Sequence, residues 1–154
     1  MTLIWFTAKN IQNRGNFVSV IRAETTGSVS NMKLTLTGRP ITKKNHQQIV
    51  LAKTGRRYVI QSKQYLAYEK DCLWQIKAQH KNETITDKIN LQALYYMPDK
   101  RKPDLLNLLQ ATADILEKAR VIDNDKDIVS FDGSMIMWVD KANPRTEITI
   151  ERRD

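Results

Sequence analysis

Carboxylate side chains gather in two places of a chain of 154 residues that is otherwise basic, with a formal net charge of +8. Asp123, Asp125 and Asp127 lie within five residues, and Asp104 precedes a strongly periodic apolar segment. Mg²⁺ prefers carboxylate oxygens among protein ligands and completes its octahedron with water and phosphate oxygens. Carboxylates in so basic a chain therefore suggest a metal site that acts on an anionic substrate. The alternative is a polar turn between a helix and a strand, which Asp and Asn also favour.

A length argument connects Asp104 with Asp125. A helix over residues 104–118 rises about 22 Å, and the seven residues from Ala119 to Asp125 reach about 23 Å when extended. A return strand packed along the helix would bring Asp125 beside Asp104, whose charge the helix dipole favours. We therefore expect Asp104 and Asp125 to hold one metal ion together. The alternative is that Asp104 only caps the helix and Asp125 only shapes a turn.

Basic residues dominate residues 41–68, which contain six Lys or Arg and no acidic residue. Gly55 interrupts this stretch, which predicts an irregular basic arm or hairpin that follows a phosphate backbone. A second basic cluster lies between Asp99 and Asp104. The candidate DNA-binding residues are Lys43, Lys44, Lys53, Arg56, Arg57, Lys100, Arg101 and Lys102. The alternative is a solvated loop with ordinary surface lysines.

Composition argues against several other kinds of site. The aspartates at 123, 125 and 127 imitate the start of an EF-hand loop, but Ile128 replaces the required Gly and Ser134 the bidentate Glu. One Cys and two His argue against a zinc site. Cys72 cannot form an internal disulfide, which favours a reducing compartment and hence the cytoplasm. No apolar run approaches about 18 residues, so we expect no membrane span.

Hydrophobic periodicity predicts the elements that must position these residues. Ser62 and Asp104 are the expected N-caps of two helices. The expected elements are a strand over 32–38, a helix over about 62–79, a strand over 85–97, a helix over about 104–118, segments 128–131 and 135–139 as one bent strand or a tight hairpin, and a strand over 146–151. This order predicts class α+β, a small mixed β-sheet with two helices.

Residues 1–31 differ from the rest of the chain because they contain few periodic apolar positions. A clean alternation of apolar and polar residues begins only at Met32. We expect Met32 to open the domain and residues 1–31 to be an N-terminal extension, either disordered or the product of an upstream translation start.

From Met32 to the C-terminus the sequence resembles the RusA family of Holliday-junction resolvases, which are common in prophages. The resemblance begins with LTGRPITKKN and continues with SKQYLAYEKD in the first helix. Its most specific part is RKPDLLNLLQATADILEKARVIDNDKDIV, and PRTEITIERR resembles the closing strand. The family implies an α+β RusA-like fold for residues 32–154.

The resemblance also assigns individual positions. Asp104 matches the first carboxylate of the family and Asp125 the last, so both are implied catalytic residues and metal ligands. Asn107 and Asp114 match the helix-start Asn and the mid-helix Asp. The departures from the family pattern are Leu106 in place of the second carboxylate, Gln110 in place of a helix Lys, and Asn124 in place of the first Asp of the usual pair.

The family implies a homodimeric endodeoxyribonuclease that makes paired nicks in four-way DNA junctions during recombination and repair, with Mg²⁺ or Mn²⁺ as cofactor. Leu106 cannot ligate a metal, and Gln110 cannot supply positive charge to the transition state. One hypothesis is therefore an enzyme with a reduced ligand set that recruits Asp123, Asp127 or Asp99. Another is a protein that binds branched DNA without cutting it. A third, an unrelated nucleic-acid-binding protein, explains the basic arm but not the spacing from 104 to 125.

Overall fold

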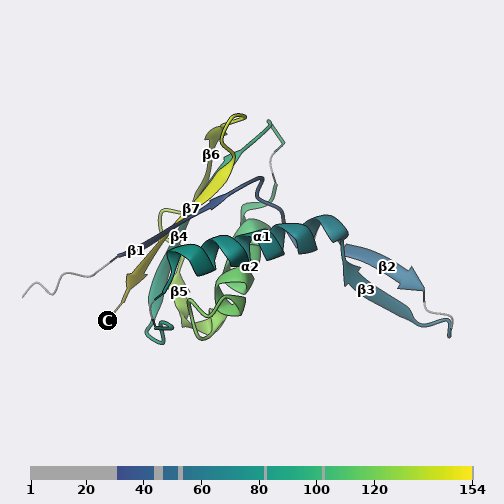
Figure 1. The fold of residues 1–154 in the computed structure, drawn as a ribbon, viewed down its shortest axis with the longest axis horizontal. Helices are drawn as coiled ribbons and strands as arrows, with labels where there is room; N and C mark the ends of the chain where they lie inside the picture. Colours follow the sequence, from purple (N-terminus) through teal and green to yellow (C-terminus); the bar gives the residue numbers. More distant parts are fainter. Residues whose placement is uncertain (1–30, 44–46, 52–53, 82, 102, 154) are drawn as a thin grey trace, which may run out of the picture.

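The computed structural model describes residues 31–43, 47–51, 54–81, 83–101 and 103–153 (Figure 1). The predicted extension therefore lies outside the described residues except for Asn31. The elements in chain order are β1 (Met32–Thr37), β2 (Gln47–Leu51), β3 (Arg57–Gln61), α1 (Lys63–Gln79), β4 (Ile89–Met97), α2 (Leu105–Lys118), the 3₁₀ helix η2 (Asp125–Asp127), β5 (Ile128–Ser130), β6 (Met135–Val139) and β7 (Arg145–Arg152). The α+β class with two helices is confirmed.

The main sheet has the order β1, β7, β4, and then β5 and β6, which both pair with β4. β7 is antiparallel to β1, with Met32 opposite Ile150, and antiparallel to β4, with Leu91 opposite Ile150. β5 and β6 run parallel to β4 and follow one another along it. They are therefore two parts of one interrupted strand, so the alternative of a tight hairpin at this place is wrong.

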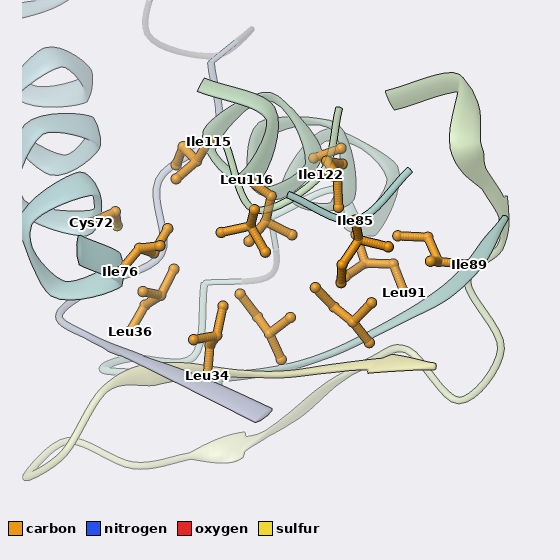
Figure 2. Packing of buried hydrophobic residues seen from close by; sticks show 14 residues of the cluster. Leu34, Leu36, Cys72, Ile76, Ile85, Ile89, Leu91, Ile115, Leu116 and Ile122 are labelled. Carbon is orange, nitrogen blue, oxygen red and sulfur yellow. The ribbon is translucent and has the colours of Figure 1, made fainter. Parts of the chain in front are cut away.

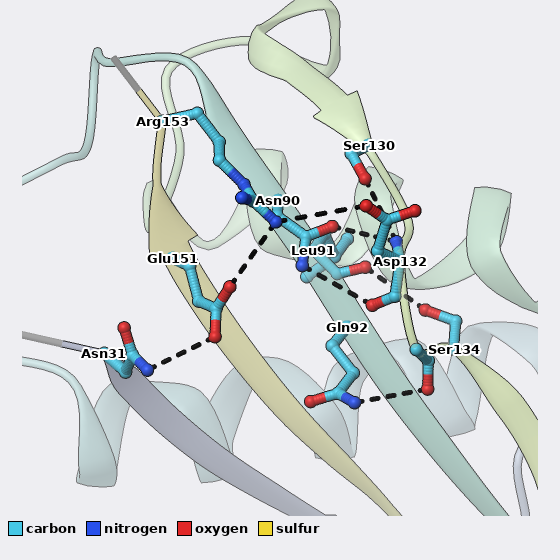
Figure 3. A network of polar contacts seen from close by, with 10 residues as sticks. Asn31, Asn90, Leu91, Gln92, Ser130, Asp132, Ser134, Glu151 and Arg153 are labelled. Carbon is cyan, nitrogen blue, oxygen red and sulfur yellow. Dashed lines mark hydrogen bonds and ion pairs between the residues drawn. The ribbon is translucent and has the colours of Figure 1, made fainter. Parts of the chain in front are cut away.

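The interruption between β5 and β6 is fixed to β4 by polar contacts (Figure 3). The N–H of Asp132 donates to Asn90 Oδ1 at 2.9 Å, and Ser134 Oγ accepts from the N–H of Ala93 at 2.9 Å. Gly133 has a φ of 78°, and a Cβ there would collide with the side-chain amide of Gln92. These contacts replace the ladder hydrogen bonds that the interruption removes, and only glycine suits its turn.

Both helices contribute to one apolar core with the main sheet (Figure 2). The buried side chains of α2 include pairs three and four residues apart, as the periodicity predicts, and those of β1 and β7 alternate along each strand. β4 is more deeply buried, with consecutive buried residues at 89–91 and 95–97. The core members include Leu34, Leu36, Cys72, Ile76, Ile89, Leu91, Ile115, Leu116, Ile148 and Ile150. Each buried aliphatic side chain of this size contributes about 1.5–3 kcal/mol, so this layer holds the helices on the sheet.

The predicted helix ends agree with the structure. Ser62 caps α1, and its Oγ accepts the N–H of Tyr65 at 3.1 Å. The strand predicted from residue 85 begins only at Ile89, because residues 86–88 are exposed and Ile85 forms an isolated parallel bridge with Ile122. Sequence alternation did not reveal this gap.

β2 and β3 form a separate two-stranded antiparallel sheet that projects from the start of α1, away from the main sheet (Figure 1). The basic arm is therefore a hairpin, and we refer to it as the β2–β3 hairpin. Among the described residues, neither helix is long and apolar enough to cross a membrane.

Candidate functional site

Asp104 is the N-cap of α2, as predicted. Its Oδ1 accepts the N–H of Leu106 at 2.9 Å and the N–H of Asn107 at 3.4 Å, while its backbone is extended. One carboxylate oxygen thus satisfies two helix amides that have no partner within the helix. The side chain is therefore held in one position at the exposed start of α2.

The segment between β4 and α2, which leads into this cap, contains several charged side chains. Asp99 forms ion pairs with Arg39 at 3.3 Å and with Arg101 at 3.8 Å, and it accepts the N–H of Arg101 at 3.0 Å. Its charge is thus balanced, which weakens it as a recruited metal ligand. Lys100 and Arg101 are exposed, whereas Lys102 lies outside the described residues. Arg39 was not predicted from sequence, because nothing along the chain connects it with Asp99.

Leu106 and Gln110, the two departures from the family pattern, lie on the exposed side of α2. Leu106 is 73% exposed. Gln110 donates from its Nε2 to Asp114 Oδ1 at 2.9 Å, and Lys43 Nζ lies 2.9 Å from Asp114 Oδ2. A positive charge is therefore one side chain away from position 110. This charge comes from Lys43 in the segment before β2, 71 positions before Asp114 in sequence, so spacing within the helix gave no signal for it.

The chain returns along α2 over a shorter path than the length argument assumed. Ala119 and Arg120 form a turn in which Arg120 has a φ of 59°, and the N–H of Val121 donates to Leu116 O at 3.0 Å. The chain can leave this turn only from Val121, so at most about 13 Å of it leads to Asp125, whereas α2 rises about 21 Å. η2 packs against α2, but the sharing of one ion by Asp104 and Asp125 stays a prediction.

The other aspartates of this loop have structural contacts. Asp123 forms an ion pair with Arg120 at 3.8 Å. Asn124 caps η2, and its Oδ1 accepts the N–H of Lys126 at 3.0 Å. Asp125 and Asp127 begin and end η2, and neither is fully buried. This loop therefore combines a polar turn with the half-buried residues Asp125 and Asp127.

Metal chemistry at this site can be judged from the available oxygens. Among the described residues, no group of three or more His, Cys, Asp or Glu side chains is arranged to hold a metal ion. Mg²⁺ needs only one or two carboxylates when water and phosphate oxygens complete its shell. Asp104 and Asp125 are the pair predicted for that weaker kind of site, and their joint binding of one ion stays a prediction.

No thiol in the core competes with this site as a nucleophile. Cys72 is fully buried, and burial raises the pKa of its thiol to about 11. The thiolate is the reactive form of cysteine, so this residue acts as a small apolar side chain of the core.

The predicted DNA-binding residues divide into two groups. Arg56 and Arg57 are exposed on the β2–β3 hairpin, and Lys43 lies at its base in the ion pair with Asp114. Lys44 and Lys53 lie outside the described residues. The structure thus provides exposed cations both on the hairpin and near the start of α2.

Two comparisons with known proteins bear on this arrangement. A family model described as endodeoxyribonuclease RusA matches residues 37–151. A curated protein of Aquifex aeolicus (strain VF5), named crossover junction endodeoxyribonuclease RusA, is 29% identical over 97 residues, which are 63% of this chain and 74% of that protein. The region matched by the family model contains both helices, the β2–β3 hairpin and all the candidate site residues.

Proposed function

Because the chain belongs to the RusA family of endodeoxyribonucleases, we propose that it binds four-way DNA junctions and cuts their phosphodiester backbone with a divalent metal ion. The observation that carries this proposal is the fixed carboxylate of Asp104 at the start of α2, shortly after the exposed Lys100 and Arg101 in the chain. A carboxylate beside exposed cations suits a site that must bind both a metal ion and a phosphate.

Asp104 and Asp125 are the residues we assign to the metal. Oδ1 of Asp104 is occupied by the helix amides, so its other oxygen, Oδ2, is the one we assign as ligand. Bound Mg²⁺, or Mn²⁺ in its place, supplies a Lewis acid for the phosphoryl oxygen and a water of lowered pKa. The cations Lys100 and Arg101 hold the phosphate beside the start of α2.

A second copy of the chain completes the proposal, since two symmetric nicks need two sites. The outer edge of the sheet supports this choice. Residues 127–140, which we call the β5–β6 edge, contain three Asp and no Lys or Arg, so DNA is not attracted there. Its exposed large side chains are Val129, Phe131, Met135, Trp138 and Val139. We propose that two β5–β6 edges meet about a two-fold axis in a homodimer, which acts in recombination and repair in the cytoplasm.

A second candidate function is binding of branched DNA without cleavage. It is favoured by Leu106, which exposes an apolar side chain at the start of α2, and by the neutral Gln110. If these two residues limit catalysis, Leu106→Asp with Gln110→Lys should raise Mg²⁺-dependent cleavage about 100-fold or more, because an oxygen ligand and a cation are added together. Asp125→Asn in the same protein should remove that gain and leave binding intact.

The deciding experiment is incubation of the purified protein with an end-labelled four-way junction, with and without Mg²⁺. Paired nicks that need Mg²⁺ and disappear in Asp104→Asn support the nuclease. A retarded complex without nicks supports the binding protein. If neither nicks nor a junction-selective complex forms, both candidates are wrong. If the double substitution binds junctions but does not cut, the metal assignment to Asp104 and Asp125 is wrong.

A further inference from the structure

The β2–β3 hairpin exposes apolar side chains on both of its faces. Ile49 and Leu51 lie two residues apart on one face, where they are 72% and 66% exposed. Val50 points to the opposite face, where it is paired with Tyr58, and Ile60 follows two residues after Tyr58. These three side chains are 42%, 50% and 45% exposed, respectively. Phosphate binding alone gives no reason for apolar residues here, since it uses charged and polar groups.

An isolated two-stranded hairpin is only marginally stable in water, so exposed apolar groups on both faces indicate a partner. A partner that docks on a flat surface covers one face and leaves the other in water. Apolar side chains on both faces instead favour insertion of the hairpin into its partner, with an apolar surface of the partner against each face. Arg56 and Arg57 lie at the turn of the same hairpin, and residues 41–68 contain no acidic residue. The partner on both sides is therefore a polyanion that also offers apolar surfaces. A nucleic acid has both properties, because its bases have apolar faces.

The base of the hairpin is fixed to the helix that carries the candidate site. Ile41, Tyr65 and Ala111 form a buried cluster, and the ion pair of Lys43 with Asp114 adjoins it on α2. α1 begins immediately after β3, so there is no long linker. Asp104 precedes Ala111 by seven residues, which is about 10 Å along α2. DNA that meets the hairpin is therefore held near the start of α2.

We propose that the β2–β3 hairpin is a wedge whose exposed apolar side chains separate stacked base pairs at the branch point of bound DNA. This inference rests on the proposed function, because it takes branched DNA as the ligand. At a branch point, strands pass from one duplex to another, so the stacking of base pairs is interrupted and a narrow hairpin enters between them. Apolar wedges that unstack bases are a general device for opening DNA, and arginines next to them hold the displaced phosphates.

The test uses a four-way junction with 2-aminopurine next to the branch point, because its fluorescence rises when the base is unstacked. Binding of the unaltered protein should raise this signal without Mg²⁺ and thus without cleavage. Ile49→Ser with Leu51→Ser should abolish most of the rise and lower the preference for junction over linear duplex about tenfold. Affinity for duplex should stay the same, because the basic residues are retained. Leu66→Ser, which removes an exposed leucine from α1, is the matched control and should behave as the unaltered protein does.

Each other outcome overturns the wedge. If the protein binds the junction without a rise in fluorescence, the wedge is wrong and the proposed function stands. The wedge is also wrong if the serine variant opens the junction as well as the Leu66→Ser control does. A serine variant whose mass in solution, measured without DNA, is changed would show that the hairpin covers a second copy instead. If the unaltered protein does not prefer junctions to duplex, the proposed function fails, and the wedge fails with it.

Discussion

The β2–β3 hairpin and the β5–β6 edge both expose apolar β-structure, yet they carry opposite charge. Residues 41–68 contain six basic residues and no acidic one, whereas residues 127–140 contain three acidic residues and no basic one. The shape of an exposed strand does not choose its partner, because its backbone groups and apolar side chains suit any neighbouring surface. We infer from this difference that charge determines the kind of partner: the basic hairpin suits DNA, and the acidic edge suits another protein surface.

The largest effect should come from charge placed in the β5–β6 edge. Met135→Lys with Val139→Lys should weaken self-association about 100-fold or more, because each side chain occurs twice in a two-fold interface. Sedimentation equilibrium should show a dimer for the unaltered protein and a monomer for this variant. Ile49→Lys with Leu51→Lys is the control and should leave the mass unchanged. If the hairpin variant dissociates and the edge variant does not, the assignment of the hairpin to DNA and of the edge to protein is wrong.

The next effect concerns DNA affinity. Arg56→Ala with Arg57→Ala should lower junction affinity at least about tenfold and reduce the slope of log affinity against log salt by about two, because each phosphate contact contributes close to one unit. Fluorescence anisotropy across a salt series measures both quantities. Lys141→Ala, an exposed cation just beyond the β5–β6 edge, should change neither. Equal losses in the two variants would mean that position does not matter and that overall charge alone binds the DNA.

A smaller effect should follow from loosening the base of the hairpin. Asp114→Asn removes the ion pair with Lys43, which is partly exposed and is therefore worth about 0.5 kcal/mol. We expect a loss of about 1–2 °C in Tm and a fall of a few-fold in junction affinity, since the hairpin is then less well fixed. Glu69→Gln removes a different ion pair, which joins α1 to α2 at 2.6 Å from Lys118. It should lower Tm in the same way and leave junction affinity intact, and a loss of affinity there would show that Lys43 has no special role.

The smallest effect should follow from deletion of residues 1–31. A chain that begins at Met32 keeps both regions and loses only the contact of Asn31 with Glu151 among the described residues. We expect its circular dichroism spectrum, Tm, mass and junction affinity to match those of the full chain. A Tm lower by about ten degrees would place several kcal/mol of packing in that segment, and the domain boundary would then be wrong.

Local signals predicted the helices well. Ser62 and Asp104 have the residue types that cap helices, and the apolar spacing of α2 has a period of 3.6. The cap also located half of the candidate site, because a helix N-cap is defined by its own neighbours in sequence. Alternation likewise predicted β1 and β7, since one face of each is buried.

Pairings between distant residues were not predictable in this way. The succession of β5 and β6 along β4, the contact of Lys43 with Asp114 and that of Arg39 with Asp99 all depend on how separate segments meet in space. The short return to Asp125 had no signal either, because the left-handed turn uses Arg120 where glycine is usual. The sequence therefore proposed Asp125 as the partner of Asp104, but it did not predict the path of the chain between them.

The position of β7 between β1 and β4 has a consequence for how the protein is made. The ribosome synthesises the chain from its N-terminus, so β1 and β4 emerge before β7, the strand that lies between them. Each then exposes a strand edge until β7 has been synthesised, a condition that favours aggregation and chaperone binding. A chain that lacks β7 has no strand to join β1 to β4. The main sheet should therefore assemble in nascent chains only after β7 has left the ribosome.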